Sequence, residues 1–395
     1  MTSPRDASPT GTSKSPIPSS KKRILVIFGT RPEAIKLCPV IEALGTLSPA
    51  IETLVCATAQ HREMLDQVLD VFRIRPDFDL NIMLDGQTLP GLTSRLLAAL
   101  EPLFRDLRPD LAIVQGDTTT TLCGALSAFY ARTPIAHVEA GLRTGDLNAP
   151  FPEELNRTAT TRMATLHFAP TQSAAENLLR EGVTPERVEV TGNTGVDALL
   201  QIRDRLESGE LTGLPERLDG RKHLVAVTAH RRESFGDAFR NVCLAIGDIA
   251  ARPDVQIVWP VHPNPNVQDI VNATLRDRNN VILTDPMPYV PFVDLLRRAT
   301  LILTDSGGIQ EEAPSLGKPV LVLRDKTERP EASAAGTAKL VGSDRARIVQ
   351  ECNRLLDNSS EVARIAKIQN PYGDGRASER IARSISAFLI HHNVR

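Results

Sequence analysis

The sequence contains no apolar run that approaches the roughly 18 residues needed to cross a bilayer as a helix, so no membrane span is expected. It has only 5 cysteines, and none of them forms a CxxC pair. Such scattered, odd-numbered thiols argue against a disulfide framework or a zinc site and indicate a reducing compartment, the cytoplasm. An excess of one charge is also missing, since 46 Lys and Arg stand against 48 Asp and Glu. This balance argues against nucleic-acid binding by the whole chain and leaves room only for a local basic patch.

Two common nucleotide-binding motifs are absent as well. The turns that follow the apolar runs at 21–28 and 223–229 do not read GxGxxG, and the GxG at Gly373 follows no predicted strand. No P-loop is present, because Gly317-Lys318 is followed by a proline. We therefore expect neither a bound dinucleotide nor ATP hydrolysis by a P-loop.

What the sequence does contain is an alternation of short apolar runs with segments of helical periodicity. Apolar runs that alternate with helices predict parallel sheets covered by helices on both faces, which is an α/β fold. Strands are predicted at residues 21–28, 51–57, 110–115, 134–139, 187–192, 223–229, 256–261, 280–285, 301–305 and 319–323.

A length of 395 residues suggests roughly two or three domains. Residues 1–20 are mostly Ser, Thr, Pro, Gly and Ala without an apolar stretch, which predicts a disordered tail and no signal peptide. The alternation is interrupted at about 197–221 by a charged segment. We therefore predict two Rossmann-like domains, at 21–196 and 222–376, with a junction between them and a separate segment at 377–395.

Polar residues follow most of the predicted strands. In open parallel sheets, ligands bind beyond the carboxyl ends of the strands, so these residues are candidates for a site. Several also have a purely structural explanation: Asp117 can cap the next helix, Glu153 can interact with a helix dipole, and His230 can be a core histidine. His137 lies inside a strand pattern and is expected in the core. The main candidates from these segments are Arg31, Lys36, Asp117, Glu139, Glu153, His230 and Arg231.

The turn Ser306-Gly307-Gly308 is the most informative of these segments. Two glycines that open a helix directly after a buried strand allow backbone N–H groups to approach a phosphate, with the helix dipole behind them. Cations and carboxylates at other strand ends can add phosphate binding and proton transfer. Together these features suit a sugar nucleotide bound between two domains.

Long blocks of unusual sequence run in order from about Arg23 to about Ala387. They are FGTRPEAIK (28–36), TAQHREMLDQVL (58–69), QGDTTTT (115–121), HVEAGLRTGD (137–146), PEELNR (152–157), HRRESFG (230–236), PVHPNPNV (260–267), TDSGGIQEEAPSLGKPVLVLRD (304–325) and TERPEA (327–332). These blocks closely resemble those of the non-hydrolysing UDP-N-acetylglucosamine 2-epimerases of bacteria.

The resemblance implies a GT-B-like fold, with a C-terminal helix at about 377–391 that returns to the first domain. It implies reversible conversion of UDP-GlcNAc to UDP-ManNAc for cell-surface polysaccharide, without added cofactor or metal, by a homodimer. The acid/base carboxylates of the family correspond to Asp117, Glu139 and Glu153, and its motif histidine to His230. Substrate contacts carried over by motif are Arg31, Lys36, Asp117, Glu139, His230, Phe292, Ser306, Gly307, Gly308, Glu312 and Arg329.

Two positions depart from the family pattern. Gln115 stands where relatives often have His, which is expected to tune activity, and Met287 replaces a frequent Gln, which weakens any side-chain contact to uracil there. Some bacterial members are activated by their own substrate at an adjacent site. The matching residues here are Gln60, Glu63 and His262, so substrate activation is an expectation.

The chemistry is compatible with this family. C2 of the sugar has no neighbouring carbonyl, so its simple deprotonation would give an unstabilised carbanion, and an NAD fingerprint is missing. Expulsion of UDP from C1 with loss of the C2 proton avoids this difficulty, and it requires a phosphate clamp and proton-transfer groups. The alternatives are a GT-B glycosyltransferase, a hydrolysing epimerase, an epimerase for a UDP-diacetamido-uronic acid, and a non-catalytic binding protein.

Overall fold

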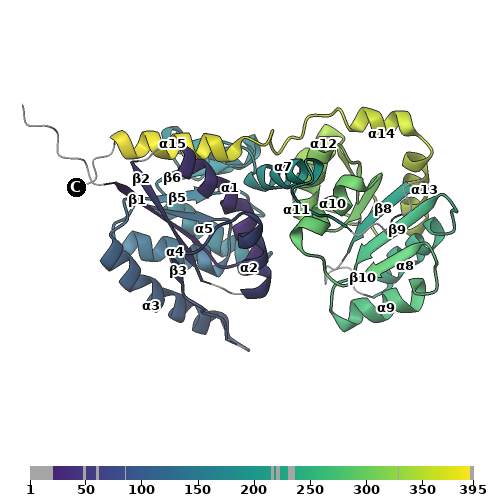
Figure 1. Cartoon of the computed structure of the whole chain (residues 1–395), viewed down its shortest axis with the longest axis horizontal. Coiled ribbons are helices and arrows are strands. Elements are labelled where there is room, and N and C mark those ends of the chain that lie inside the picture. Colours follow the sequence, from purple (N-terminus) through teal and green to yellow (C-terminus); the bar gives the residue numbers. More distant parts are fainter. Residues whose placement is uncertain are drawn as a thin grey trace, which may run out of the picture.

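The computed structural model of the chain describes residues 21–47, 50–58, 62–84, 86–214, 218, 223–229, 236–327 and 329–391, with only the backbone at 47, 62 and 63 (Figure 1). The tail predicted at residues 1–20 therefore lies outside the described residues. Two parallel sheets, each covered by helices, form two α/β domains, as the sequence predicts.

The N-terminal domain contains the larger sheet. Its elements are β1 (Lys22–Phe28), α1 (Arg31–Leu47), β2 (Ile51–Ala57), α2 (Arg62–Val71), β3 (Phe78–Asp79), α3 (Leu89–Leu107), β4 (Leu111–Gln115), α4 (Thr119–Tyr130), β5 (Ile135–Val138), α5 (Glu153–Met163), β6 (Leu166–Ala169), α6 (Gln172–Arg180), η1 (Pro185–Arg187), β7 (Val188–Val190) and α7 (Thr194–Glu207).

The C-terminal domain contains the smaller sheet. Its elements, and the last helix of the chain, are β8 (His223–Thr228), α8 (Asp237–Ile249), β9 (Val255–Pro260), α9 (Pro265–Leu275), β10 (Val281–Thr284), α10 (Tyr289–Arg298), β11 (Leu301–Thr304), α11 (Gly307–Glu312), η3 (Ala313–Leu316), β12 (Val320–Val322), α12 (Pro330–Ala335), β13 (Ala338–Leu340), α13 (Arg345–Leu356), α14 (Ser359–Ile365) and α15 (Ala377–His391).

Strand β1 shows why the strands read as continuous apolar runs. Ile24, Val26 and Phe28 enter the apolar cluster on one face of the sheet, whereas Leu25 and Ile27 enter the cluster on the other face. Helices α1, α2, α7 and α15 contribute to the first cluster, and α3 and α4 to the second. Because both faces are covered, neither set of side chains needs to be polar.

The order of the strands determines where a ligand can bind. Within the described residues the sheets run β3-β2-β1-β4-β5-β6-β7 and β10-β9-β8-β11-β12-β13. In each sheet the direction of winding reverses beside the first strand, between β1 and β4 and between β8 and β11. In open parallel sheets these reversals are the places where ligands bind, beyond the carboxyl ends of the strands.

Two helices connect the domains. Helix α7 packs on α1 of the N-terminal domain and also on α10 and α11 of the C-terminal domain. Helix α15 follows the C-terminal domain in sequence but packs on α1, and Figure 1 shows it lying along the N-terminal domain. Its apolar residues Ile381, Ile385 and Leu389 belong to the apolar cluster of that domain.

Candidate active site

Lys36 and Glu139 form an ion pair between α1 and the turn after β5. The side chains are only 15% and 10% exposed, and Gln115 Nε2 donates to the same Glu139 oxygen over 3.1 Å. Burial alone would lower the pKa of Lys36, but Glu139, Glu311 and Glu312 outweigh it, so this pKa is raised. Lys36 is therefore a charged ammonium group held among carboxylates.

Asp117 lies in the turn after β4 and is held from two sides. His137 shares a hydrogen bond of 2.8 Å with the carbonyl oxygen of Gly116, a residue with φ of +74°. Asn156 Nδ2 donates to the Asp117 carbonyl oxygen over 2.8 Å, and an Arg157 nitrogen lies 2.7 Å from Asp117 Oδ2. The turn is therefore fixed by both the β5 strand and helix α5. His137 is fully buried, as predicted.

The Asp117 carboxyl group has a raised pKa. Burial is the largest cause, while Arg157 and Lys36 oppose it and the charges of Glu139 and Glu153 add to it. Glu153 is the first residue of α5 and is half-buried. The structure thus brings Lys36 and three carboxylates of different segments into one electrostatic group.

Glu33 links the turns that follow β1 and β4. Its Oε2 accepts hydrogen bonds from the backbone N–H groups of Gly29 (3.0 Å) and Thr30 (2.8 Å), and the bond to Thr30 is one half of a capping box. Its Oε1 accepts from the hydroxyl groups of Thr118 (2.7 Å) and Thr121 (3.2 Å). The side chain is 1% exposed, so one buried carboxylate fixes the two turns relative to each other.

In the C-terminal domain, the start of α11 lies against Arg329. A Cβ atom added at Gly307 would be only 3.0 Å from the guanidinium carbon of Arg329, so glycine permits this close approach. Arg329 Nε donates to Glu311 over 2.7 Å. Ser306 precedes the helix as its N-cap residue. Backbone N–H groups and a guanidinium group therefore lie side by side, an arrangement suited to a phosphate.

Glu312 connects the two groups of residues electrostatically. Burial raises its pKa to about 8; Lys36 and Arg31 counteract this rise, and Glu311 and Glu139 add to it. The two cations that act on Glu312, Lys36 and Arg31, both come from the N-terminal domain. A Cβ atom added at Gly195 of α7 would lie 3.2 Å from Glu312 Oε1 and 3.6 Å from Lys36 Cε, which shows how closely the two domains approach here.

Arg31 also reaches the C-terminal domain. Its guanidinium group donates to the Met287 carbonyl oxygen over 3.4 Å. Burial lowers its pKa, against the effect of Tyr289 and Glu312. Tyr289 is 5% exposed, stacks obliquely on Phe72 with ring centres 6.5 Å apart, and has no hydrogen-bond partner for its hydroxyl group among the described residues.

Two of the remaining predicted residues, Phe292 and His262, are described by the structure but do not join this group. Phe292 packs against an apolar cluster of the C-terminal domain, as does Met287. His262 is exposed, and its Nδ1 accepts from the backbone of Asn264 over 3.2 Å. His230 and Gln60 lie outside the described residues, as does the side chain of Glu63.

Three residues near the site were not chosen as site residues from the sequence. Tyr289 lies in an apolar helical pattern that gives no sign of a polar environment. Glu311 is buried and accepts from Asn193 as well as Arg329, so it fixes the guanidinium group from within the C-terminal domain. Asn193 was detectable only as a helix N-cap, since its side chain also accepts from the N–H of Gly195.

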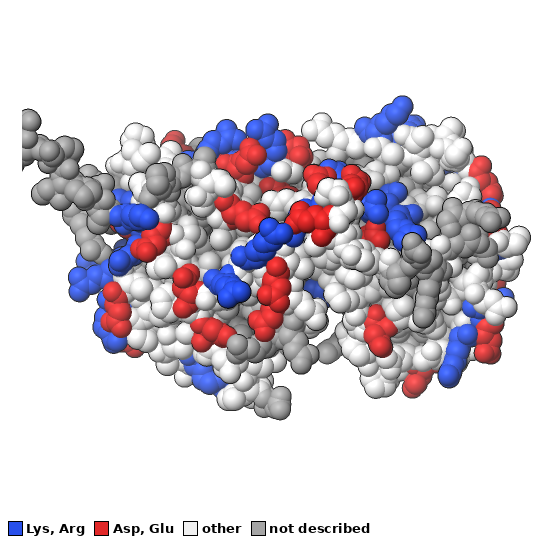
Figure 2. Space-filling model, in the orientation of Figure 1, with Lys and Arg blue, Asp and Glu red and all other residues white. Residues whose placement is uncertain are grey.

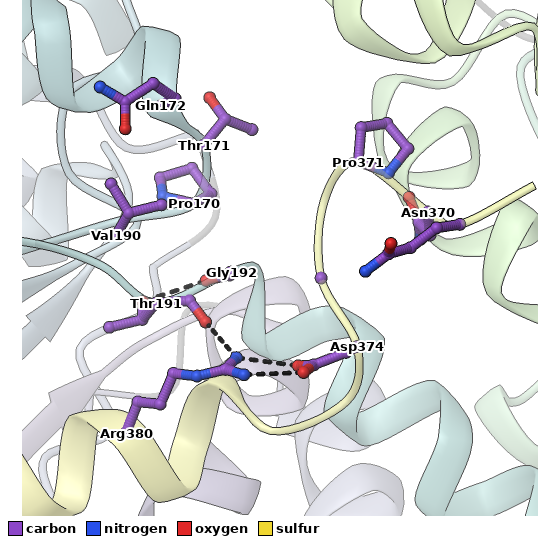
Figure 3. A pocket seen from close by; sticks show the side chains of 12 residues that line it. Pro170, Thr171, Gln172, Val190, Thr191, Gly192, Asn370, Pro371, Asp374 and Arg380 are labelled. Atoms are coloured by element: carbon purple, nitrogen blue, oxygen red, sulfur yellow. Dashed lines mark hydrogen bonds and ion pairs between the residues drawn. The ribbon is translucent and has the colours of Figure 1, made fainter.

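A cavity of about 440 Å³ lies elsewhere between the domains, at the ends of β6 and β7. It is lined on one side by the segment that leads to α15, and Figure 3 shows Arg380 joined to Asp374 and to the Thr191 carbonyl oxygen. None of the predicted site residues lines it. This cavity therefore belongs to the crossing between domains and not to the group around Lys36.

The described residues contain neither a cluster of metal ligands nor a membrane-spanning helix. No three His, Cys, Asp or Glu side chains there are grouped so that they could hold a metal ion. No described helix is both long and apolar enough to cross a membrane. On the face drawn in Figure 2, acidic and basic residues are interspersed, in keeping with the balanced composition.

Two Rossmann-like domains whose strand ends bring carboxylates and cations together define a GT-B-like α/β protein. The chain belongs to the UDP-N-acetylglucosamine 2-epimerase family, which it matches over residues 46–386. It is 55% identical to the UDP-N-acetylglucosamine 2-epimerase of Escherichia coli K12 over 369 residues, 92% of this chain and 98% of that protein.

Solved structures agree with this assignment. The UDP-GlcNAc 2-epimerase of Neisseria meningitidis, crystallised with UDP-GlcNAc, has a TM-score of 0.86 and 46% identity, and the alignment covers 92% of this chain and 100% of that one. The enzyme of Methanocaldococcus jannaschii, in complex with UDP-GlcNAc and UDP, has a TM-score of 0.74 and 33% identity over 93% and 99% of the two chains.

Proposed function

We propose that this protein interconverts UDP-GlcNAc and UDP-ManNAc by elimination and re-addition of UDP, without hydrolysing the product. The observation that carries the proposal is the group formed by Lys36, Asp117 and Glu139, with Glu153 beside it, facing a glycine-arginine site at the start of α11. Such a site combines proton transfer with the binding of a leaving diphosphate.

The reaction balances without an oxidant or reductant. A carboxylate removes the C2 proton, the C2–H electron pair forms the C1=C2 bond, and the C1–O bond breaks so that UDP leaves with its electron pair. The intermediate is 2-acetamidoglucal. UDP then adds back to C1 while a protonated group delivers a proton to the opposite face of C2.

The residues divide between these tasks according to their position. Arg31, Arg329 and the N-terminus of α11 are suited to the diphosphate, because they offer charge-assisted hydrogen bonds from both domains. Asp117, whose pKa burial raises above its ordinary value, is proposed as one of the groups that transfer the C2 proton. Lys36 keeps a positive charge beside Glu139 where negative charge develops on the departing diphosphate.

Other residues complete the proposal on the strength of the family motifs. His230, Phe292, Ser306, Gly308 and Glu312 are proposed substrate contacts, with His230 also in the catalytic set. Substrate activation through Gln60, Glu63 and His262 is proposed in the same way.

The setting of the enzyme is proposed from its surface and its thiols. All 5 cysteines are buried and free, as in a reducing cytoplasm, where UDP-ManNAc would supply cell-surface polysaccharide. Phe129 and Tyr130 at the end of α4 are 55% and 71% exposed, and their ring centres lie 6.3 Å apart. Such an apolar patch favours a homodimer.

The test is NMR spectroscopy of UDP-GlcNAc incubated in heavy water with the purified protein and no additives. We expect UDP-ManNAc to appear with deuterium at C2, because the proton removed from one face is not the proton delivered to the other. Carboxamide variants (Asp117→Asn, Glu139→Gln, Glu153→Gln) should each lose roughly 10²- to 10⁴-fold in rate while they still bind UDP.

The same spectra distinguish the alternatives. Free ManNAc with UDP would indicate a hydrolysing epimerase, and turnover only of a UDP-diacetamido-uronic acid would change the substrate. UDP-ManNAc without deuterium at C2 would contradict the elimination mechanism. Full activity in all three carboxamide variants would contradict the site.

A further inference from the structure

Arg157 of α5 makes contacts that the proposed reaction does not yet explain. One terminal nitrogen lies 2.7 Å from Asp117 Oδ2, and the other lies 3.4 Å from Glu154 Oε2. The Arg157 side chain is 11% exposed, and its Nε is buried without a partner among the described residues. An arginine so nearly removed from water interacts strongly with the carboxylates it touches.

Glu154 fixes the arginine from the other side. Its side chain is 2% exposed, and its Oε1 accepts from the backbone N–H groups of Thr144 (3.1 Å) and Gly145 (3.0 Å). A chain of contacts thus runs from the loop after β5 through Glu154 and Arg157 to Asp117. Because Asn156 of the same helix also holds the Asp117 backbone, α5 restrains both the carboxylate and its turn.

The charges around Asp117 show what the arginine contributes. Glu139 from the turn after β5 and Glu153 from α5 disfavour a charged Asp117, as does burial. Lys36 from α1 opposes them, but it is paired with Glu139. Among the described residues that face this carboxylate, Arg157 is the cation in direct contact with it.

We propose that Arg157 is a positioning residue, which orients the Asp117 carboxyl group and keeps it in the charged form between proton transfers. This inference rests on the proposed function, because it assigns Asp117 a proton-transfer role that needs a defined charge. Arg157 acts through Asp117 and does not itself touch the reacting carbons.

The experiment compares the pH dependence of kcat/KM for UDP-GlcNAc in the wild type and in Arg157→Gln. Loss of the cation should move the limb that reports Asp117 to higher pH by about 1 unit. It should also lower kcat by roughly 10- to 100-fold through misplacement of the carboxylate, with little change in KM. Arg157→Lys, which keeps the charge, should leave the limb near its wild-type position.

Arg143→Gln is a matched control. Arg143 is 10% exposed and pairs with Glu181 over 2.6 Å, so its removal also breaks a shielded ion pair of the same domain, but not one with Asp117. This variant should lose stability without moving the pH limb. A limb that stays in place in folded Arg157→Gln, or that moves as far in Arg143→Gln, would overturn the proposal.

Two further measurements separate this inference from the proposed function. Glu154→Gln keeps Arg157 and removes its second carboxylate, so the limb should move to lower pH, and an upward movement would count against the role of Arg157. Carbon-13 NMR titration of Asp117 in ligand-free protein, assigned with Asp117→Asn, needs no turnover. If the wild type does not convert UDP-GlcNAc, the proposed function fails, while the titration still shows whether Arg157 controls the Asp117 charge.

Discussion

Two buried histidines lie side by side on adjacent strands behind the Asp117 turn. His137 of β5 pairs in register with His167 of β6, and both side chains are at most 1% exposed. Burial lowers the pKa of His137 to about 3 and that of His167 to about 4. Neither imidazole is therefore protonated in the folded protein at mildly acid pH.

Their pKa values make stability depend on pH. In the unfolded chain both histidines titrate near pH 6.5, so below that pH the unfolded state binds protons that the folded state does not. The contribution of this difference to the free energy of unfolding is complete above about pH 6.5. It is lost as the pH falls toward 4, the folded pKa of His167, and then toward 3, the folded pKa of His137. At pH 5 the loss should be about 2 kcal/mol for each histidine.

Urea unfolding at pH 7 and pH 5 measures this effect, and His137→Gln provides the comparison. The variant should lose less stability than the wild type between the two pH values, whatever its stability at pH 7. An equal loss in both proteins would show that His137 does not contribute to the pH dependence.

At this scale, the sequence predicted which residues would follow the strands but not which of them would meet. Asp117, Glu139 and Lys36 come together because the carboxyl ends of parallel strands share one edge of a sheet. The alternation of strands and helices in the sequence predicts that shared edge, but not the contacts made along it. The contact of Arg31 with Met287 joins segments from different domains. No local pattern encodes such a distance, and the roles of the individual site residues stay predictions.

At the scale of the elements, every strand predicted from an apolar run is present in the structure. The strands that were not predicted are β3, β6 and β13, which are 2, 4 and 3 residues long. β6 contains a buried histidine, and β13 contains a lysine, so neither reads as an apolar run. Strands this short are determined by pairing with their neighbours and not by their own composition.

Helix α15 depends on a cap provided by another helix. Asp197 of α7 is 4% exposed, and its carboxylate accepts from the backbone N–H groups of Ala377 (3.3 Å) and Ser378 (2.7 Å). These are the first residues of α15, whose unpaired N–H groups need acceptors. The contact ties the start of α15 to the helix that lies between the domains.

Asp197→Ala should therefore destabilise the protein by about 1 to 2 kcal/mol, since it leaves two N–H groups of a helix start without an acceptor. Thermal and urea unfolding measure the change. Asp374→Ala is the control, because Asp374 pairs with Arg380 on the surface and its loss should cost less than about 1 kcal/mol. A larger effect in the control than in Asp197→Ala would show that the cap is not what holds α15.

At the scale of the whole molecule, the domains already touch on the side of α7. Glu331 of α12 accepts hydrogen bonds from Thr171 (3.2 Å) and Ser173 of the N-terminal domain. It also accepts one from Tyr372 (3.0 Å), which lies on the segment between α14 and α15. Tyr289 of α10 packs into the apolar cluster of the N-terminal domain. We expect these contacts to act as a pivot for domain closure, and Figure 2 shows a notch between the domains at the lower edge of the molecule.

A nucleoside diphosphate should draw the two domains together about this pivot. The cations proposed to bind it come from both sides, Arg31 from the N-terminal domain and Arg329 from the C-terminal domain, so a bound diphosphate would attract each toward the other. Exclusion of water by closure would also protect the glucal intermediate. Small-angle X-ray scattering should show a smaller radius of gyration with saturating UDP than without it. Arg31→Ala should bind UDP more weakly and stay expanded at the UDP concentration that compacts the wild type. Identical scattering profiles of the wild type with and without UDP would contradict closure, and equal compaction of the variant would remove Arg31 from the diphosphate site.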